Sequence, residues 1–269
     1  MLRTAGPSEE EVRNAAEAGA KRFEAHKASF LEKITEEVSK CINATNADPS
    51  GIVAEAIKNS RYFVLAGTQI VKNIASLAFA NEFPPGALTA NDWDLYHATE
   101  KCTSGETWKL DPKKNFKVTN KYILGQHDLS VPVNVVTGKN LSLEALVSGF
   151  DINVGMGGVS FARDGQGKLQ VDDVFIHPQL WHFLVASHTL RIINFRTPAV
   201  SMIRLLNKAV EQRSLKVDVG EKYTLREAEG GDLIPPSGVE KLMKLRGWSG
   251  CPVANVRLVD HGRYWKKFI

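Results

Sequence analysis

Two aspartates flank one tryptophan in the segment NDWDLY, residues 91–96. If this segment is a strand, its side chains alternate between two faces, so Asp92 and Asp94 point one way while Trp93 points the other. Two carboxylates on one face of a strand repel each other and lower its strand propensity. The pair is therefore expected to have a cation between its carboxylates.

A third aspartate, Asp151, lies between apolar neighbours in GFDINVGMGGVSF (149–161), a segment whose pattern predicts another strand. Proteins bind hard divalent cations such as Mg²⁺ through a few carboxylates together with phosphate oxygens of the substrate. Three aspartates on adjacent strands suit Mg²⁺ or Mn²⁺. With two ions about 3.5–4 Å apart, one would activate an attacking oxygen while the other steadied a pyrophosphate leaving group.

A candidate phosphate-binding turn precedes the aspartate pair. The apolar segment RYFVLAG predicts a strand that ends at Gly67 and Thr68 and leads into a helix over 70–83. A glycine lets backbone N–H groups approach a phosphate closely, and the positive end of the following helix favours an anion. The same strand, turn and helix also occur in many α/β folds without a ligand, so this alternative stays open.

Helical periodicity dominates the first sixty residues. Ser8 and Glu11 have the form of a capping box, and apolar residues recur at steps of three, four or seven as far as Val38. This pattern predicts an amphipathic helix, with one break allowed, followed after a polar turn by a second helix that begins at Asp48.

The rest of the chain alternates between β-rich and helical patterns. Residues 100–118 are polar and basic and are expected to form a surface loop or ribbon. Further elements are expected as strands over 119–125 and 131–137, a short helix over 141–148, a hairpin turn at 165–168, and helices over 179–192, 198–214 and 239–248. An α+β fold follows, with an N-terminal helical region (1–59), a core with a mixed β-sheet (60–176), and a C-terminal helical subdomain with a tail (177–269).

Composition sets wider bounds on the function. The 269-residue chain is 43% hydrophobic, enough to bury a large core, and its net charge of +4 permits a polyanionic partner without requiring one. Its three cysteines are far apart and lack CxxC spacing, so they indicate neither a disulfide framework nor a zinc site. The N-terminus has no apolar leader and no run of eighteen apolar residues occurs, which predicts an intracellular, cytoplasmic protein without a membrane partner.

The order of three short motifs resembles a known superfamily. The segments VLAGT, DWDL and FDIN are similar to the motifs of the nucleotidyltransferases of the DNA polymerase beta type. In that superfamily a strand ends in glycine and a small hydroxyl residue, and a helix, an acid pair and a third acid follow in that order. KYILG, VPVNVV, the LEAL helix and GFDINVGMGGVSF look like a viral and mobile-element branch, which implies a viral protein in a host cytoplasm. IHPQLW and a helix carrying Pro198 resemble the helical subdomain of that branch. The resemblance covers residues 60–212 and implies a nucleotidyltransferase-like core.

The resemblance also implies roles for the candidate residues. Asp92 and Asp94 would ligate metal, and Asp151 would bind the catalytic metal and help to deprotonate an acceptor hydroxyl. Gly67 and Thr68 would hold the triphosphate, with Thr68 in place of the usual serine or second glycine.

Basic and amide residues are further candidates. Arg204 and Lys208, four residues apart on one predicted helix face, are suited to binding phosphate charge, and a solvated basic face is the alternative reading. Asn91 and Asn153 are candidates to support the aspartates by hydrogen bonds.

The leading interpretation is a metal-dependent nucleotidyltransferase that moves a nucleoside monophosphate from an NTP to a hydroxyl, with Mg²⁺ or Mn²⁺ as cofactor and pyrophosphate as product. An RNA 3′ end, a small molecule and a protein side chain all stay open as acceptors, and the basic surplus favours RNA. A second interpretation is a catalytically inactive relative that acts as a nucleic-acid-binding or structural module. A third is an unrelated α+β nucleic-acid-binding protein, in which the three aspartates would lie apart.

Overall fold

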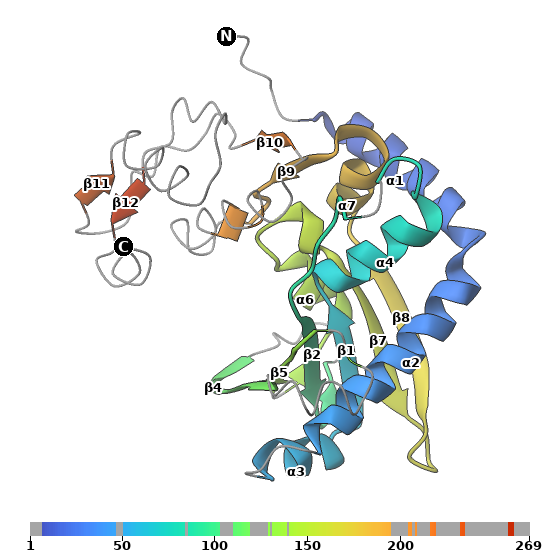
Figure 1. Cartoon of the computed structure of the whole chain (residues 1–269), viewed down its shortest axis with the longest axis vertical. Helices are drawn as coiled ribbons and strands as arrows, with labels where there is room; N and C mark the ends of the chain where they lie inside the picture. The colour runs from blue at the N-terminus through green and yellow to red at the C-terminus, as the bar shows by residue number, and fades with distance from the viewer. Residues whose placement is uncertain are drawn as a thin grey trace.

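The structure is a computed structural model of the 269-residue chain. It describes residues 7–46, 51–83, 86–102, 110–118, 129, 131–138, 140–194, 204, 205, 208, 216–218, 232–234 and 258–260. Helices pack around a mixed six-stranded sheet, so the expected α+β class is confirmed (Figure 1).

The sheet has the strand order β4-β5-β2-β1-β7-β8. Its strands are β1 (Tyr62–Ala66), β2 (Trp93–Ala98), β4 (Leu110–Val118), β5 (Val133–Gly138), β7 (Gly157–Arg163) and β8 (Leu169–Ile176). Neighbouring strands in this sheet are antiparallel, except that β2 and β5 are parallel. The central strand β1 is buried along its whole length, which explains its uninterrupted apolar sequence.

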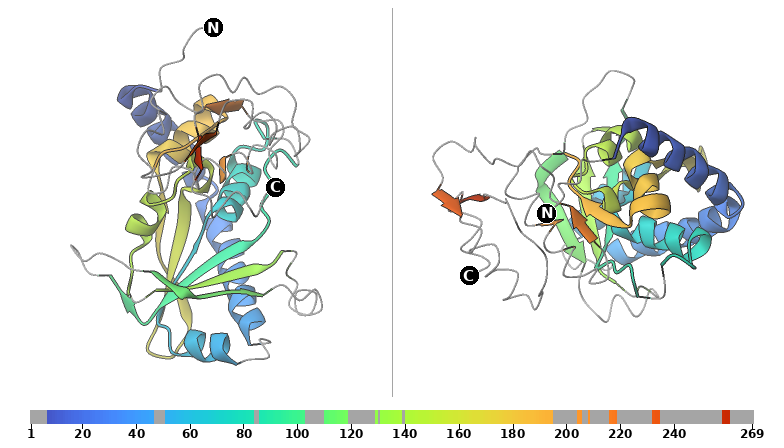
Figure 2. Two further views of the ribbon diagram at one scale, coloured as in Figure 1. Left: turned by 90° about the vertical axis from the view of Figure 1, so that its left-hand side faces the viewer. Right: turned by 90° about the horizontal axis from the view of Figure 1, so that it is seen from above.

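Helices cover both faces of the sheet (Figure 2). They are α1 (Glu9–Glu24), α2 (Lys27–Thr45), α3 (Ile52–Lys58), α4 (Thr68–Ala78), α6 (Leu143–Ser148) and α7 (Pro178–His182).

Two consecutive glycines of β7 show which helix lies on which face. Adjacent residues of a strand face opposite sides. A Cβ atom at Gly157 would lie 3.0 Å from Leu180 of α7 and 3.4 Å from Ile70 of α4. A Cβ atom at Gly158 would lie 2.9 Å from Leu143 of α6. Helices α4 and α7 therefore cover one face and α6 covers the other, and the glycines let them approach the sheet closely.

The N-terminal helices form largely as the sequence predicts. The capping box of Ser8 and Glu11 is present at the start of α1, and the chain breaks once before α2 begins at Lys27. Helix α1 packs on α7, where the rings of Phe23 and Trp181 lie 5.8 Å apart. The second predicted helix is α3, but it begins at Ile52 and not at Asp48, because Gly51 has a left-handed φ of 67° that a helix cannot include. Asp48 itself lies outside the described residues.

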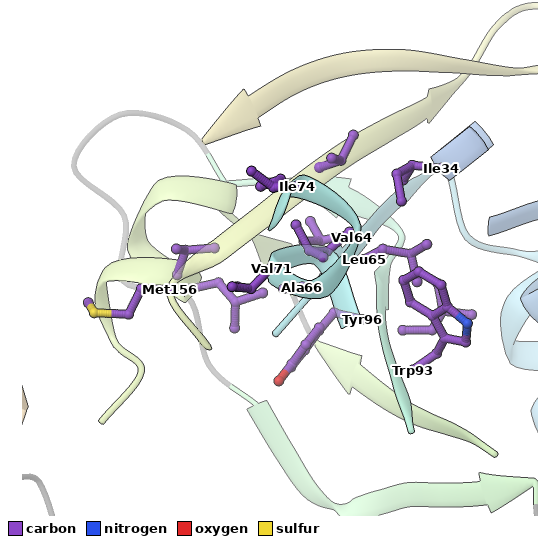
Figure 3. Close-up of a cluster of buried hydrophobic side chains, with 14 of the residues drawn as sticks. Ile34, Val64, Leu65, Ala66, Val71, Ile74, Trp93, Tyr96 and Met156 are labelled. Carbon is purple, nitrogen blue, oxygen red and sulfur yellow. The ribbon is translucent and has the colours of Figure 1, made fainter. Parts of the chain in front are cut away.

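One hydrophobic core joins these helices to the sheet. Figure 3 shows Val64 of β1, Val71 of α4 and Trp93 of β2 in a cluster that Ile34 of α2 also enters. Phe30 of α2 is fully buried in the same core. The N-terminal helices therefore stabilise the strands that carry the candidate site.

The segment around Asp151 differs from the prediction. Strand β7 begins only at Gly157, and a 3₁₀ turn, η1 (Asn153–Gly155), precedes it. Asp151 therefore lies in the connection between α6 and β7, and its predicted place on a strand is wrong. The physical reason is the turn itself, which the Asn153 side chain holds by hydrogen bonds to the backbone of Thr189 and Arg191.

Two other predicted elements also change. The helix expected over 179–192 continues from α7 only through a π-helical turn, η2 (Phe183–Ser187), and ends at His188, which has a left-handed φ of 47°. The next residues form strand β9 (Thr189–Arg191). Residues 100–118 contain strand β4, as well as β3 (Glu100–Lys101), which pairs with β6 (Asn140–Leu141).

The described parts beyond β9 are short. Strand β10 (Lys216–Asp218) pairs with β9, β11 (Asp232–Ile234) pairs with β12 (Leu258–Asp260), and residues 204, 205 and 208 are helical. The expected strand over 119–125, the helix over 239–248 and most of the helix over 198–214 lie outside the described residues. The nucleotidyltransferase-like core, the helical C-terminal subdomain and the domain boundaries stay predictions.

Candidate functional site

The candidate site begins where β1 ends. Gly67 has a φ of 93° and a ψ of −162°, a conformation that only glycine adopts readily. Its N–H donates to the carbonyl oxygen of Gly157 at 3.0 Å, which ties the bend to the start of β7. Helix α4 begins at the next residue, so its N-terminal end, with the positive end of the helix dipole, lies at this end of the sheet.

Asp94 lies beside this bend. It pairs with Ala66 across β1 and β2, so its side chain stands next to the last residue of β1. Its Oδ2 atom is 3.0 Å from the position that a Cβ atom would take at Gly67. The structure therefore brings together two residues predicted separately, one for phosphate and one for metal.

Asn134 of β5 holds the other oxygen of the same carboxylate. Strands β2 and β5 are parallel, with Asn134 in register with Asp94. The Asn134 Nδ2 donates to Asp94 Oδ1 at 2.8 Å. Asn134 is not among the site residues predicted from the sequence. The available signal was a lone amide within the apolar strand segment VPVNVV.

Trp93 explains the spacing of the two aspartates around it. Its side chain is buried, 3% exposed, and it points to the opposite face from Asp94. The backbone N–H of Trp93 donates to the carbonyl oxygen of Pro132 at 2.8 Å. Asp92 immediately precedes β2 and is partly buried. The tryptophan thus anchors the strand from the core side and leaves carboxylates at the other face.

The side chain of Tyr96 is influenced by four of the charged candidate residues. It lies two residues after Asp94 on the same face of β2 and is buried. Burial raises the pKa of its hydroxyl well above the usual value, and the carboxylates of Asp94, Asp92 and Asp151 raise this pKa further. The nearby Arg204 guanidinium lowers it. All four charged groups therefore act on one buried hydroxyl.

Asp151 forms an ion pair with Arg204. The Arg204 Nη1 atom lies 2.8 Å from Oδ1 and 3.0 Å from Oδ2 of Asp151. The Asp151 side chain is 17% exposed and that of Arg204 is 61% exposed, so solvent screens the pair from one side. The ring of the preceding residue, Phe150, lies 6.3 Å from that of Tyr96. The third predicted aspartate is therefore near the other two but is engaged by an arginine.

Asn153 serves the backbone and not the aspartates. Its Nδ2 donates to the carbonyl oxygen of Thr189, and its Oδ1 accepts the N–H of Arg191, both at 2.9 Å. These bonds attach η1 to β9. The prediction that Asn153 supports the carboxylates by hydrogen bonds is wrong, and Asn134 makes such a bond instead.

The structure describes the positions of three of the predicted phosphate-binding residues, Thr68, Arg204 and Lys208. Thr68 is the first residue of α4 and is partly buried. Lys208 is helical and partly buried, four residues after Arg204. The Arg204 guanidinium contacts the carboxylate of Asp151, an anion that occupies the role predicted for a phosphate.

The carboxylates suit one divalent cation held by a pair of ligands. Mg²⁺ is commonly bound by one or two carboxylates with substrate phosphates completing its coordination. Asp92 and Asp94 supply such a pair. Within the described ranges, no group of three or more His, Cys, Asp or Glu residues is arranged to hold a metal ion. The expected three-carboxylate metal site stays a prediction, and in the described residues Asp151 pairs with Arg204.

Comparison with known proteins adds no relative. No protein-family model matches the chain, and no curated protein is significantly similar to it. In the part of the chain that the structure describes, no helix has both the length and the apolar character needed to cross a membrane. A functional assignment therefore depends on the geometry at the end of β1.

Proposed function

We propose that the chain binds a nucleoside triphosphate with Mg²⁺ or Mn²⁺ at the end of β1 and transfers the nucleoside monophosphate to a hydroxyl, releasing pyrophosphate. The proximity of Asp94 to the bend at Gly67 carries this proposal. The N-terminus of α4, which attracts anions, follows this bend, and the carboxylate of Asp94, which attracts cations, lies beside it. A metal–triphosphate complex is a ligand that offers both charges to such a site.

Each candidate residue has a role in this reaction. The backbone N–H groups that follow Gly67 would bind phosphate oxygens, because a glycine admits their close approach. Asp92 and Asp94 would hold the metal ion. When bound, that ion would neutralise charge on the phosphates and on the pyrophosphate that leaves. Arg204 would add positive charge at the same end of the sheet.

The transfer itself needs a proton acceptor. The hydroxyl oxygen of the acceptor attacks the α-phosphorus, the bond to the pyrophosphate oxygen breaks, and the hydroxyl proton must leave. Asp151 is the remaining carboxylate near Tyr96 and is the residue assigned to receive it. The positive net charge makes an RNA 3′ end the first acceptor to test.

A transfer assay tests this function. The purified chain is incubated with α-labelled NTPs, Mg²⁺ or Mn²⁺, and pooled RNA, and incorporation of label is measured. We expect incorporation by the wild type and background levels for Asp92→Asn and Asp94→Asn. Glu32→Gln, which removes an exposed carboxylate of α2, is the matched control and should retain wild-type transfer.

Two results would contradict the proposal. Equal incorporation by the aspartate variants and the wild type would assign the activity to a contaminant. Absence of transfer by the wild type to RNA, small hydroxyl compounds and protein, with all four NTPs and both metals, would reject a transferase.

The Asp151–Arg204 ion pair favours a second function, binding without turnover. If the arginine neutralises Asp151 permanently, no carboxylate is left to receive the hydroxyl proton. The chain would then act as a nucleotidyltransferase-like module that binds a metal–triphosphate complex or nucleic acid. Calorimetry with Mn²⁺ and ATP would show binding that Asp94→Asn abolishes, while the transfer assay would stay at background.

A further inference from the structure

Asn134 is a partly buried amide in an apolar strand. Its neighbours Val133 and Val135 are fully buried and face the opposite side of β5. A partly buried amide costs free energy unless it forms hydrogen bonds. Asn134 forms one with Asp94 Oδ1 at 2.8 Å.

The carboxylate of Asp94 has β5 on one side and β1 on the other. Strand β2 lies between β5 and β1 in the sheet. On the β5 side, the Asn134 amide donates to Oδ1, and on the β1 side, Oδ2 lies 3.0 Å from the position that a Cβ atom would take at Gly67. The hydrogen bond from Asn134 therefore orients this carboxylate, and the missing side chain at Gly67 leaves room for it.

The type of donor at position 134 is also informative. An arginine or lysine in this place would neutralise the carboxylate, and an aspartate would repel it. A neutral amide fixes the orientation of a carboxylate and leaves its full negative charge available to a cation. Residues that bind metal ions are commonly held by hydrogen-bond partners of this kind, and loss of such a partner typically weakens metal binding by about 10–100-fold.

We infer that Asn134 is the positioning residue of Asp94, holding its carboxylate in the orientation in which Asp94 binds a divalent cation. This inference rests on the proposed function, because it assigns a supporting residue to the same site. The residue that positions Asp94 therefore lies on β5, a strand that carries none of the site residues predicted from the sequence motifs.

Titration with Mn²⁺ alone, followed by electron paramagnetic resonance, tests the inference without any need for activity. We expect Asn134→Leu, which is similar in size and lacks the donor, to weaken Mn²⁺ binding by about 10–100-fold. Asn14→Leu, at an exposed asparagine of α1, is the matched control and should bind like the wild type. A purely structural amide would lower the melting temperature of Asn134→Leu and leave its Mn²⁺ affinity unchanged.

A second variant keeps the test decisive if Asn134→Leu fails to fold. Asn134→Asp has the same size and places a second carboxylate beside that of Asp94. We expect a lower melting temperature without metal, because like charges repel, and a larger rise on adding Mn²⁺ than the wild type shows. An equal rise in the variant and the wild type would overturn the inference.

The outcomes separate this inference from the proposed function. If Asp94→Asn loses Mn²⁺ and Asn134→Leu binds it as the wild type does, the inference is overturned and the metal site stands. If the wild type and Asp94→Asn bind Mn²⁺ equally, the metal site and the inference are both overturned. If Mn²⁺ binds as expected and no nucleotide is transferred, the inference holds and the transferase is rejected.

Discussion

Replacing Gly67 by alanine perturbs the bend on which the candidate site is built. The structure assigns two separate penalties to the added methyl group. One is the backbone conformation, with φ at 93° and ψ at −162°, and the other is a contact at 3.0 Å with Oδ2 of Asp94. The Asp94 carboxylate also accepts a hydrogen bond from Asn134, and moving away from the methyl group would weaken that hydrogen bond.

The size of the effect follows from these penalties. A non-glycine residue in this backbone region costs about 1–3 kcal/mol. Displacing the carboxylate adds about 1 kcal/mol, the lower end of the cost of overpacking. The smaller freedom of alanine in the unfolded chain offsets about 0.4–1 kcal/mol. The free energy of unfolding should therefore fall by about 1–4 kcal/mol, and the melting temperature by about 2–4 °C for each kcal/mol.

Urea denaturation of five variants, Gly67→Ala, Gly167→Ala, Gly165→Ala, Asp94→Ala and the Gly67→Ala/Asp94→Ala double variant, measures these penalties. Gly167→Ala, where φ is 81° and the surrounding space is open, reports the backbone cost alone, and Gly165→Ala in open space should cost little. In an Asp94→Ala background, the cost of Gly67→Ala should shrink by about 1 kcal/mol, which is the coupling energy of the contact. An unchanged cost in that background would refute the contact between Gly67 and Asp94. A wild-type stability of Gly67→Ala would refute the bend itself.

Three further predictions concern the surroundings of the site. Gly158→Ala places a Cβ atom 2.9 Å from Leu143, so urea denaturation should show a loss of about 1–3 kcal/mol, and unchanged stability would contradict the place of α6. Arg204→Met removes a cation from the site, so the affinity for a fluorescent ATP analogue with Mg²⁺, measured by an anisotropy titration, should fall. An affinity equal to that of the wild type would contradict a phosphate-binding role for Arg204. The His177 Nδ1 accepts the N–H of Gln179 at 3.2 Å, and burial lowers the pKa of His177. The stability that this histidine contributes is therefore present above its ordinary pKa of about 6.5 and is lost as pH falls below that value. His177→Asn keeps a capping side chain, so its free energy of unfolding should fall less between pH 7 and pH 5.5 than that of the wild type, and equal slopes would contradict the assignment.

The elements that could be predicted from sequence are those with local signals. The apolar run of β1 and the capping box at Ser8 each depend on residues close together in the chain. The bend at Gly67 was also recognisable, because a glycine between a strand and a helix is a local pattern. Its proximity to Asp94 depends on the pairing of β1 with β2, which follow each other along the chain with α4 between them, and strands that are consecutive in sequence often lie side by side.

The parts that could not be predicted depend on distant pairing. Asn134 meets Asp94 only because β5 lies parallel to β2 in one register, and no local pattern specifies that register. Asp151 was expected on a strand because its neighbours are apolar. The 3₁₀ turn η1, which Asn153 attaches to β9 by hydrogen bonds, separates Asp151 from the start of β7. The partner of Asp151, Arg204, lies 53 residues further along the chain.

The central claim is that a divalent cation and a triphosphate meet at the end of β1. Crystals grown with Mn²⁺ and a non-hydrolysable nucleoside triphosphate would test it most directly, through anomalous scattering at the manganese edge. We predict an anomalous peak bounded by the carboxylates of Asp92 and Asp94, with phosphate density at the N-terminus of α4. Manganese and nucleotide bound at another place, or no peak at saturating concentrations, would contradict the claim.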